Sequence, residues 1–80
     1  MRFPEPGPER RAQSHQVREG FAAAMARLPE EQREVFLMRE YGGLSFAEIS
    51  RAAGCPLGTA LARMRYAVLK LRQDMEEFHA

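Results

Sequence analysis

The sequence predicts an all-α domain of four helices, the last two arranged as a helix-turn-helix. Apolar residues recur at intervals of three and four residues through four segments, and no segment alternates as a half-buried strand does. Glycine and proline separate these segments, as expected where helices end. Residues 1–10 contain three prolines and one glycine among charged residues. We therefore expect residues 1–10 to be a disordered leader or linker and residues 11–80 to form the domain.

The first two helices are expected at about residues 11–27 and 30–41. The first has an apolar stripe made of Val17, Phe21, Ala24, Met25 and Leu28. The second starts favourably, because Pro29 presets the backbone and two acids follow it at the positive end of the helix dipole. It stops at Gly42-Gly43. Its apolar run at residues 35–38 points to more than one side, which is typical of a central helix with several neighbours.

The third helix is expected to open with a capping box. Ser45 and Glu48 have the required spacing, in which each side chain binds the other residue's backbone N–H. Gly54 ends this helix, and Cys55-Pro56-Leu57-Gly58 forms the connection. The long last helix is expected to start at Thr59, with the threonine as its N-cap.

Charge is distributed unevenly along the chain. The net charge is only +1, but residues 51–72 carry five cations and no acid; the cations are Arg51, Arg63, Arg65, Lys70 and Arg72. Attraction to a polyanion is a local effect, because it is screened beyond about 10 Å. A solvated helix face is the ordinary explanation of such a run, and a nucleic-acid surface is the alternative.

Several other classes of protein are disfavoured. The single cysteine, Cys55, excludes an internal disulfide and a multi-cysteine zinc site, and it fits a reducing cytoplasm. No apolar run approaches the roughly 18 residues that a membrane span needs. There is no glycine-rich phosphate loop, no nucleophile beside a base and no metal-ligand cluster. We expect a cytoplasmic protein that is not an enzyme and that uses no cofactor, small-molecule substrate or membrane.

A helical wheel divides the last helix into two faces. The inward stripe is expected to comprise Ala60, Met64, Ala67, Val68, Leu71 and Met75. The opposite side carries Thr59, Ala62, Arg63, Arg65, Tyr66, Leu69, Lys70 and Arg72. The second helix of a helix-turn-helix needs such a division, because one face packs on the core while the other enters the major groove.

Residues 28–72 resemble region 4 of bacterial RNA polymerase sigma factors of the extracytoplasmic-function (ECF) type. The matching pieces are the start LPEEQREV, the block GLSFAEI, the turn G-x-P-x-GT, and the arginine of ALAR followed by YAVLKLR. They occur in order over more than half of the chain. The resemblance implies a transcription-initiation domain whose last helix recognises the −35 promoter element. It also implies docking on the flap of the polymerase β subunit and, in many members, binding by an anti-sigma factor.

The last helix departs from the family's pattern at the positions that commonly face DNA. The family usually begins this helix G-T-V-K-S-R, whereas this chain has Leu61 and Ala62 in place of the lysine and the serine. Loss of one cation predicts a shallower salt dependence of binding, by about one unit of slope per phosphate contact. Base reading remains open, because alanine can contact a thymine methyl and arginine can bind guanine.

The resemblance and the wheel together give the candidate DNA contacts. They are Thr59, Ala62, Arg63, Arg65, Tyr66 and Lys70. Arg65 is the candidate for a base edge and Arg63 for a phosphate or for the domain itself, and each is weighed equally against plain surface charge. Tyr66 either hydrogen-bonds in the groove or closes the edge of the core.

Two functions remain open. The cationic face favours −35 recognition within a sigma factor. Leu61, Leu69 and Tyr66 on the outward side favour a protein-interaction module that binds an anti-sigma factor, the β flap or a second copy. Whole ECF sigma factors also carry an upstream region 2, which has no counterpart in this sequence. The chain is therefore either a fragment of a sigma factor or a stand-alone region-4 protein.

Overall fold

The computed structural model describes the backbone of residues 8–79 and the side chains of residues 16–76. This part of the chain contains four helices and no strand: α1 (Pro8–Arg27), α2 (Glu30–Glu40), α3 (Phe46–Ala53) and α4 (Leu57–His79). The all-α prediction and the order of the helices are confirmed. Helix α1 begins at Pro8 rather than near residue 11, so it takes in the last three residues of the segment expected as a leader. The rest of the expected leader, residues 1–7, lies outside the described residues.

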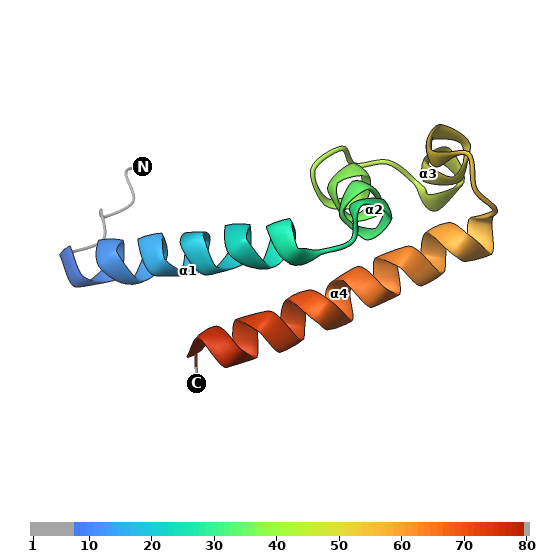
Figure 1. The fold of residues 1–80 in the computed structure, drawn as a ribbon. Helices are drawn as coiled ribbons and strands as arrows, with labels where there is room; N and C mark the ends of the chain where they lie inside the picture. Colours follow the sequence, from blue (N-terminus) through green and yellow to red (C-terminus); the bar gives the residue numbers. More distant parts are fainter. Residues whose placement is uncertain (1–7, 80) are drawn as a thin grey trace, which may run out of the picture.

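Helix α4 contacts each of the other three helices. Figure 1 shows α1 and α4 running antiparallel, so the start of α1 and the end of α4 lie at the same end of the molecule. Helices α2 and α3 lie together beside the half of α4 that begins at Leu57 (Figure 1). With 23 residues at a rise of 1.5 Å, α4 is about 34 Å long. That length allows two separate packing sites along one helix.

Two hydrophobic clusters lie along α4. One, the α1 cluster, joins α1 to α4, and its buried members are Ala24, Met25, Leu28, Ala67 and Leu71. Phe21 and Phe36 pack against it with their ring centroids 6.2 Å apart, which brings α2 to the same cluster. The other, the HTH cluster, joins α2, α3 and the first half of α4 through the fully buried Val35, Ile49 and Ala60.

The inward stripe expected for α4 is confirmed. Ala60, Ala67 and Leu71 are buried, and Met64, Val68 and Met75 are half-buried. Two residues expected to be apolar contacts elsewhere are more open: Val17 of α1 is 39% exposed and Leu37 of α2 is 41% exposed. Val17 lies one turn before Phe21, which packs against the α1 cluster. Leu37 faces a groove between α1 and α2.

The ends of α3 form as predicted, because both depend on residues close in sequence. Ser45 Oγ accepts a hydrogen bond from the Glu48 N–H, and the Glu48 carboxylate accepts one from the Ser45 N–H, each at 3.1 Å. These bonds, chiefly the one from the Ser45 backbone, lower the pKa of Glu48. Gly54 ends the helix with a φ of 66°, in the left-handed region that glycine tolerates best.

Two arginines of α2 use their charge within the domain. Arg33 Nη1 donates to carbonyl oxygens at the end of α1, at 3.4–3.5 Å, which satisfies acceptors that a helix end leaves open. The carbonyls belong to Met25, Ala26 and Leu28. Arg39 Nη1 donates to the Leu44 carbonyl at 2.9 Å, and its guanidinium lies 4.8 Å from the centroid of the Phe46 ring. These cations fix the corners between helices.

Candidate nucleic-acid interface

Helices α3 and α4 form the predicted helix-turn-helix, packed on the HTH cluster. The turn is Gly54-Cys55-Pro56, shorter than expected, because Leu57 and Gly58 already belong to α4. Cys55 is half-buried against the HTH cluster, and its carbonyl accepts a hydrogen bond from the Ser50 hydroxyl. Its N–H donates to the Ser50 carbonyl at 3.1 Å. Both backbone groups of Cys55 are therefore hydrogen-bonded to Ser50, which fixes the direction in which α4 leaves α3.

The expectation that Thr59 caps α4 is wrong. The helix begins two residues earlier, at Leu57, so Thr59 lies within the first turn. The carbonyl of Pro56 accepts hydrogen bonds from the N–H groups of Thr59 and Ala60, at 3.0 and 3.1 Å. The backbone carbonyl of Pro56, a residue whose ring fixes φ, thus accepts the first hydrogen bonds of the helix. The sequence had predicted that the Thr59 hydroxyl would have this role.

The outward side of α4 is open at its centre and partly covered at one edge. Ala62, Arg65 and Tyr66 are exposed, Tyr66 to 58%. Thr59 and Arg63 are half-buried, and on the helical wheel both lie at the edge nearest the inward stripe. Of the six candidate contacts, the structure therefore gathers three on one open surface. It places the other three, Thr59, Arg63 and Lys70, along the edge of that surface.

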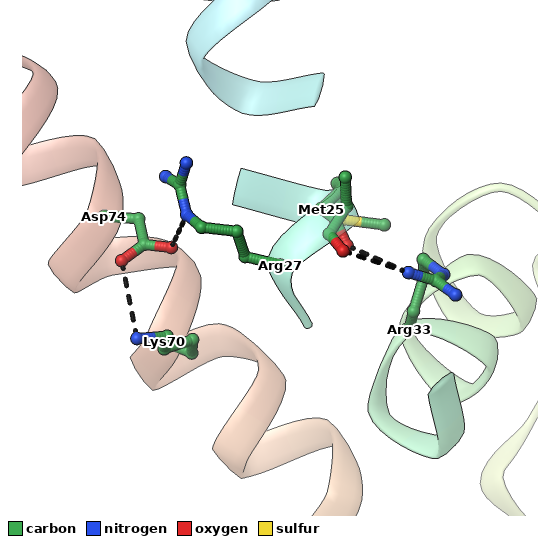
Figure 2. A network of polar contacts seen from close by, with 6 residues as sticks. Met25, Arg27, Arg33, Lys70 and Asp74 are labelled. Carbon is green, nitrogen blue, oxygen red and sulfur yellow. Dashed lines mark hydrogen bonds and ion pairs between the residues drawn. The ribbon is translucent and has the colours of Figure 1, made fainter. Parts of the chain in front are cut away.

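Asp74 is the charged residue that the sequence did not single out. Its side chain is only 6% exposed, and its carboxylate lies 3.1 Å from Arg27 Nε and 3.7 Å from Lys70 Nζ. Figure 2 shows this carboxylate between the two cations, one from the last residue of α1 and one from the preceding turn of α4. We call these three residues the acid clamp. The spacing of Lys70 and Asp74 could have indicated their pairing, whereas Arg27 lies 47 residues from Asp74 in the chain.

The other cations of residues 51–72 are not neutralised in this way. Among side chains 16–76, no ion pair involves Arg51, Arg63, Arg65 or Arg72. No acidic residue lies between Glu48 and Asp74 in the sequence. This positive charge therefore extends from Arg51 of α3 to Arg72 of α4, over the two helices with which a helix-turn-helix meets nucleic acid.

Large apolar side chains interrupt this cationic face. Leu57 is 49% exposed, Leu61 46% and Leu69 43%. Leu57 was expected in the loop but lies in the first turn of α4. Leu57, Leu61 and Arg65 are four residues apart, so they form one row along the helix surface.

Comparison with known protein families identifies the chain. Residues 18–71 match the family model described as sigma-70, region 4, from the second half of α1 through most of α4. The chain belongs to the sigma-70 region 4 family. The match takes in α3, the turn and α4 as far as Leu71, and it ends three residues before Asp74 of the acid clamp. Sigma factors are transcription factors and not enzymes.

Two relatives place the domain among ECF sigma factors. It is 44% identical over 52 residues to the ECF RNA polymerase sigma factor RpoE of Cereibacter sphaeroides, in a match covering 65% of this chain and 29% of the relative. It is 34% identical over 58 residues to the ECF RNA polymerase sigma factor EcfG of Rhodopseudomonas palustris, covering 72% of this chain and 32% of the relative. The chain thus spans about a third of the length of the curated relatives it matches. The expected resemblance to ECF region 4 is confirmed.

This region 4 domain has a second surface feature, on the side of α1 and α2. A groove of about 560 Å³ runs between these helices and is lined by Phe21, Ala22, Met25, Ala26, Arg33, Leu37 and Tyr41. Most of the lining is apolar, and Tyr41 at the end of α2 is 71% exposed. Such a groove suits an apolar segment of a protein partner better than it suits a nucleic acid.

Across side chains 16–76, no group of three His, Cys, Asp or Glu residues is arranged to hold a metal ion. None of the four helices, over the part that the structure describes, is both long enough and apolar enough to cross a membrane.

Proposed function

We propose that this region 4 domain binds the −35 promoter element with α4 in the major groove, as part of an ECF sigma factor bound to RNA polymerase in the cytoplasm. The observation that carries the proposal is the open face of α4 in the helix-turn-helix, where arginines without described ion-pair partners surround Ala62, Arg65 and Tyr66. In a helix-turn-helix, the first turns of the second helix reach base edges, while flanking cations contact phosphates.

The proposed roles of the candidate contacts follow from their exposure. Arg65 is exposed and lies at the open end of the row that starts at Leu57, so we assign it to a base edge, where arginine binds guanine with two hydrogen bonds. Tyr66 and Ala62 are assigned to the groove beside it. Thr59 and Arg63, at the half-buried edge, are assigned to phosphates. Lys70 is already paired with Asp74, so a phosphate would compete with that carboxylate for its charge. We therefore expect Lys70 to contribute least of the cations to DNA affinity.

Fluorescence anisotropy tests this assignment. A labelled promoter-like duplex and a scrambled duplex are titrated with the domain at two salt concentrations. Replacing Arg65 by alanine is expected to weaken binding to the promoter-like duplex by about tenfold or more, since a bidentate base contact contributes about 1–3 kcal/mol. Arg18→Ala is the matched control, because Arg18 is exposed on α1, outside the helix-turn-helix. Absence of binding to either duplex, with Arg65→Ala identical to wild type, would reject DNA recognition by this domain.

The groove between α1 and α2 favours a second contact, with the flap of the polymerase β subunit. An anti-sigma factor that covered the same apolar surface would compete with the polymerase for it. Leu37→Asp is expected to abolish co-purification with a β-flap fragment and to leave DNA binding unchanged, because Leu37 lines the groove and is 41% exposed. Val17→Asp is the control, since Val17 is similarly exposed but does not line the groove. Equal retention of the flap by all three proteins would exclude the groove as its site.

A further inference from the structure

We propose that Leu61, with Leu57 beside it, contacts the 5-methyl groups of thymine in the major groove, so that this domain selects sites with neighbouring thymines. The proposal rests on the proposed function, because it names what the DNA-binding face recognises. It gives a role to Leu61, a large apolar residue that is exposed among the cations of α4.

The position of the two leucines is the first argument. Single exposed leucines are common on protein surfaces and need no explanation. Leu57 and Leu61, however, are each nearly half exposed and stand in one row on the first two turns of the second helix of a helix-turn-helix. This is the part of the helix that faces base edges in such motifs. Leu69, which is as exposed, lies two turns further on and outside this part.

The positive charge around Leu61 indicates which kind of partner binds this surface. Arg51, Arg63, Arg65 and Arg72 form no ion pair with the described side chains. A partner that covers Leu61 must therefore bring negative charge next to an apolar group. Duplex DNA supplies both the negative charge and the apolar group. Its phosphates flank the major groove, and within that groove thymine presents an apolar methyl group. Charge complementarity thus points to DNA as the partner that contacts these leucines.

The small residues around the two leucines are the third argument. Gly58 has no left-handed φ, and a Cβ added to it would meet nothing within 4 Å, so neither the backbone nor the packing of the domain requires glycine there. Ala62, on the next turn, is also small and exposed. With no bulky group at either position, α4 can approach the base edges closely, and the leucines are the side chains that project.

Helix geometry then gives the spacing of the thymines. Two residues four apart in an α-helix are separated by about 6 Å along its axis, and stacked base pairs are separated by about 3.4 Å. When α4 lies along the groove, Leu57 and Leu61 therefore reach methyl groups within two base-pair steps of each other. We expect the preferred site to contain thymines at that spacing.

Replacement of thymine by deoxyuridine tests the proposal, because it removes the methyl group and keeps every hydrogen-bonding atom. Duplexes that bind the 80-residue chain are first selected from a library with a random central segment. In the best duplex, each thymine is then replaced singly by deoxyuridine and binding is measured by anisotropy. At one or two neighbouring positions we expect the affinity to fall about fourfold, which is the effect of exposing one buried methyl.

Two variants show whether Leu61 is the reader. Leu61→Ala should bind the thymine and deoxyuridine duplexes equally at the sensitive position, whereas Leu69→Ala should still distinguish them. Both leucines are exposed, so circular dichroism should show unchanged helix content. The proposal is overturned if wild type binds all deoxyuridine duplexes as well as the thymine duplex, or if Leu61→Ala keeps the difference. If no duplex is selected at all, the proposed DNA-binding function fails with it, and this outcome differs visibly from equal binding.

Discussion

The two halves of α4 both carry cations, but they use them differently. In the C-terminal half, Lys70 and Arg27 are held at the buried carboxylate of Asp74, which fastens α1 to α4 (Figure 2). In the N-terminal half, Arg65 has no ion-pair partner among the described side chains, and Leu61 is exposed beside it. Lys70 therefore helps to hold the domain together, whereas Arg65 leaves its charge available to a partner.

This difference shows that the count of cations in a helix does not predict how many of them bind DNA. The five positive charges of residues 51–72 look equivalent in the sequence. Lys70 is set apart from the others because it shares the carboxylate of Asp74 with Arg27, so its charge is partly offset within the domain. The hydrophobic core is also divided into two clusters. The α1 cluster and the HTH cluster have two helices in common, α4 and α2, and each cluster uses different residues of them. Substitutions in one cluster or the other can therefore test the two halves of α4 separately.

The largest expected effect comes from Ile49→Ala. Ile49 is fully buried in the HTH cluster, and removing a buried isoleucine side chain lowers the free energy of unfolding by about 2–5 kcal/mol. We expect the helix-turn-helix to unfold and DNA binding to be lost. Thermal denaturation followed by circular dichroism measures the change.

Leu28→Ala is the counterpart in the α1 cluster. Leu28 is 3% exposed, so the cavity is similar, but the first region to loosen is expected to be α1. Amide hydrogen exchange should rise in α1 while α3 and the first half of α4 stay protected. Equal loss of protection in all four helices would show that the two clusters unfold as one unit.

The next largest effect is expected for Asp74→Ala. The carboxylate is buried but both its cations are about half exposed, so we expect the free energy of unfolding to fall by about 1 kcal/mol, as for hydrogen bonds to charged groups near solvent. The melting temperature should fall by several degrees, and DNA affinity should be equal or higher because Lys70 is released. Glu76→Ala, an exposed acid two residues further on, is the control. An unchanged melting temperature for Asp74→Ala would contradict the role of the acid clamp.

Gly58→Ala is expected to have a small effect on folding and a clear one on binding. Alanine favours a helix over glycine by up to about 1 kcal/mol, and the added methyl meets no neighbour, so stability should be unchanged or slightly higher. DNA affinity should fall, because the methyl blocks close approach of α4 to the groove. Gly54→Ala is the contrast: with a φ of 66° at Gly54, it should destabilise the domain. Unaltered DNA affinity of Gly58→Ala would show that the groove does not come close to this residue.

The smallest effect is expected from Glu48→Gln, and it should depend on pH. Because the folded state lowers the pKa of Glu48, the unfolded state binds its proton more readily, and stability from this group is present at neutral pH and lost in acid. Glutamine keeps the capping hydrogen bond but cannot titrate. The variant should therefore lose less melting temperature than wild type when the pH falls through the glutamate range. A parallel loss in both proteins would exclude this contribution.

The sequence alone was sufficient for the features that depend on neighbours in the chain. The capping box of Ser45 and Glu48, the left-handed Gly54 and the inward stripe of α4 all formed as predicted. Each results from interactions within one or two helical turns, which a short window of sequence contains in full. The family resemblance was also correct, because its motifs are local and occur in order.

Tertiary structure decided which side chains of these helices face a neighbour and which remain free. Asp74 is buried only because α1 packs against α4 and brings Arg27 to it. Leu37 stays open because α1 and α2 leave a groove at that point. The start of α4 is different, because a neighbour in the chain decides it: the Pro56 carbonyl starts the helix two residues before Thr59. The periodicity of a helix gives the direction of each side chain, but only the packing of distant segments determines what lies in that direction.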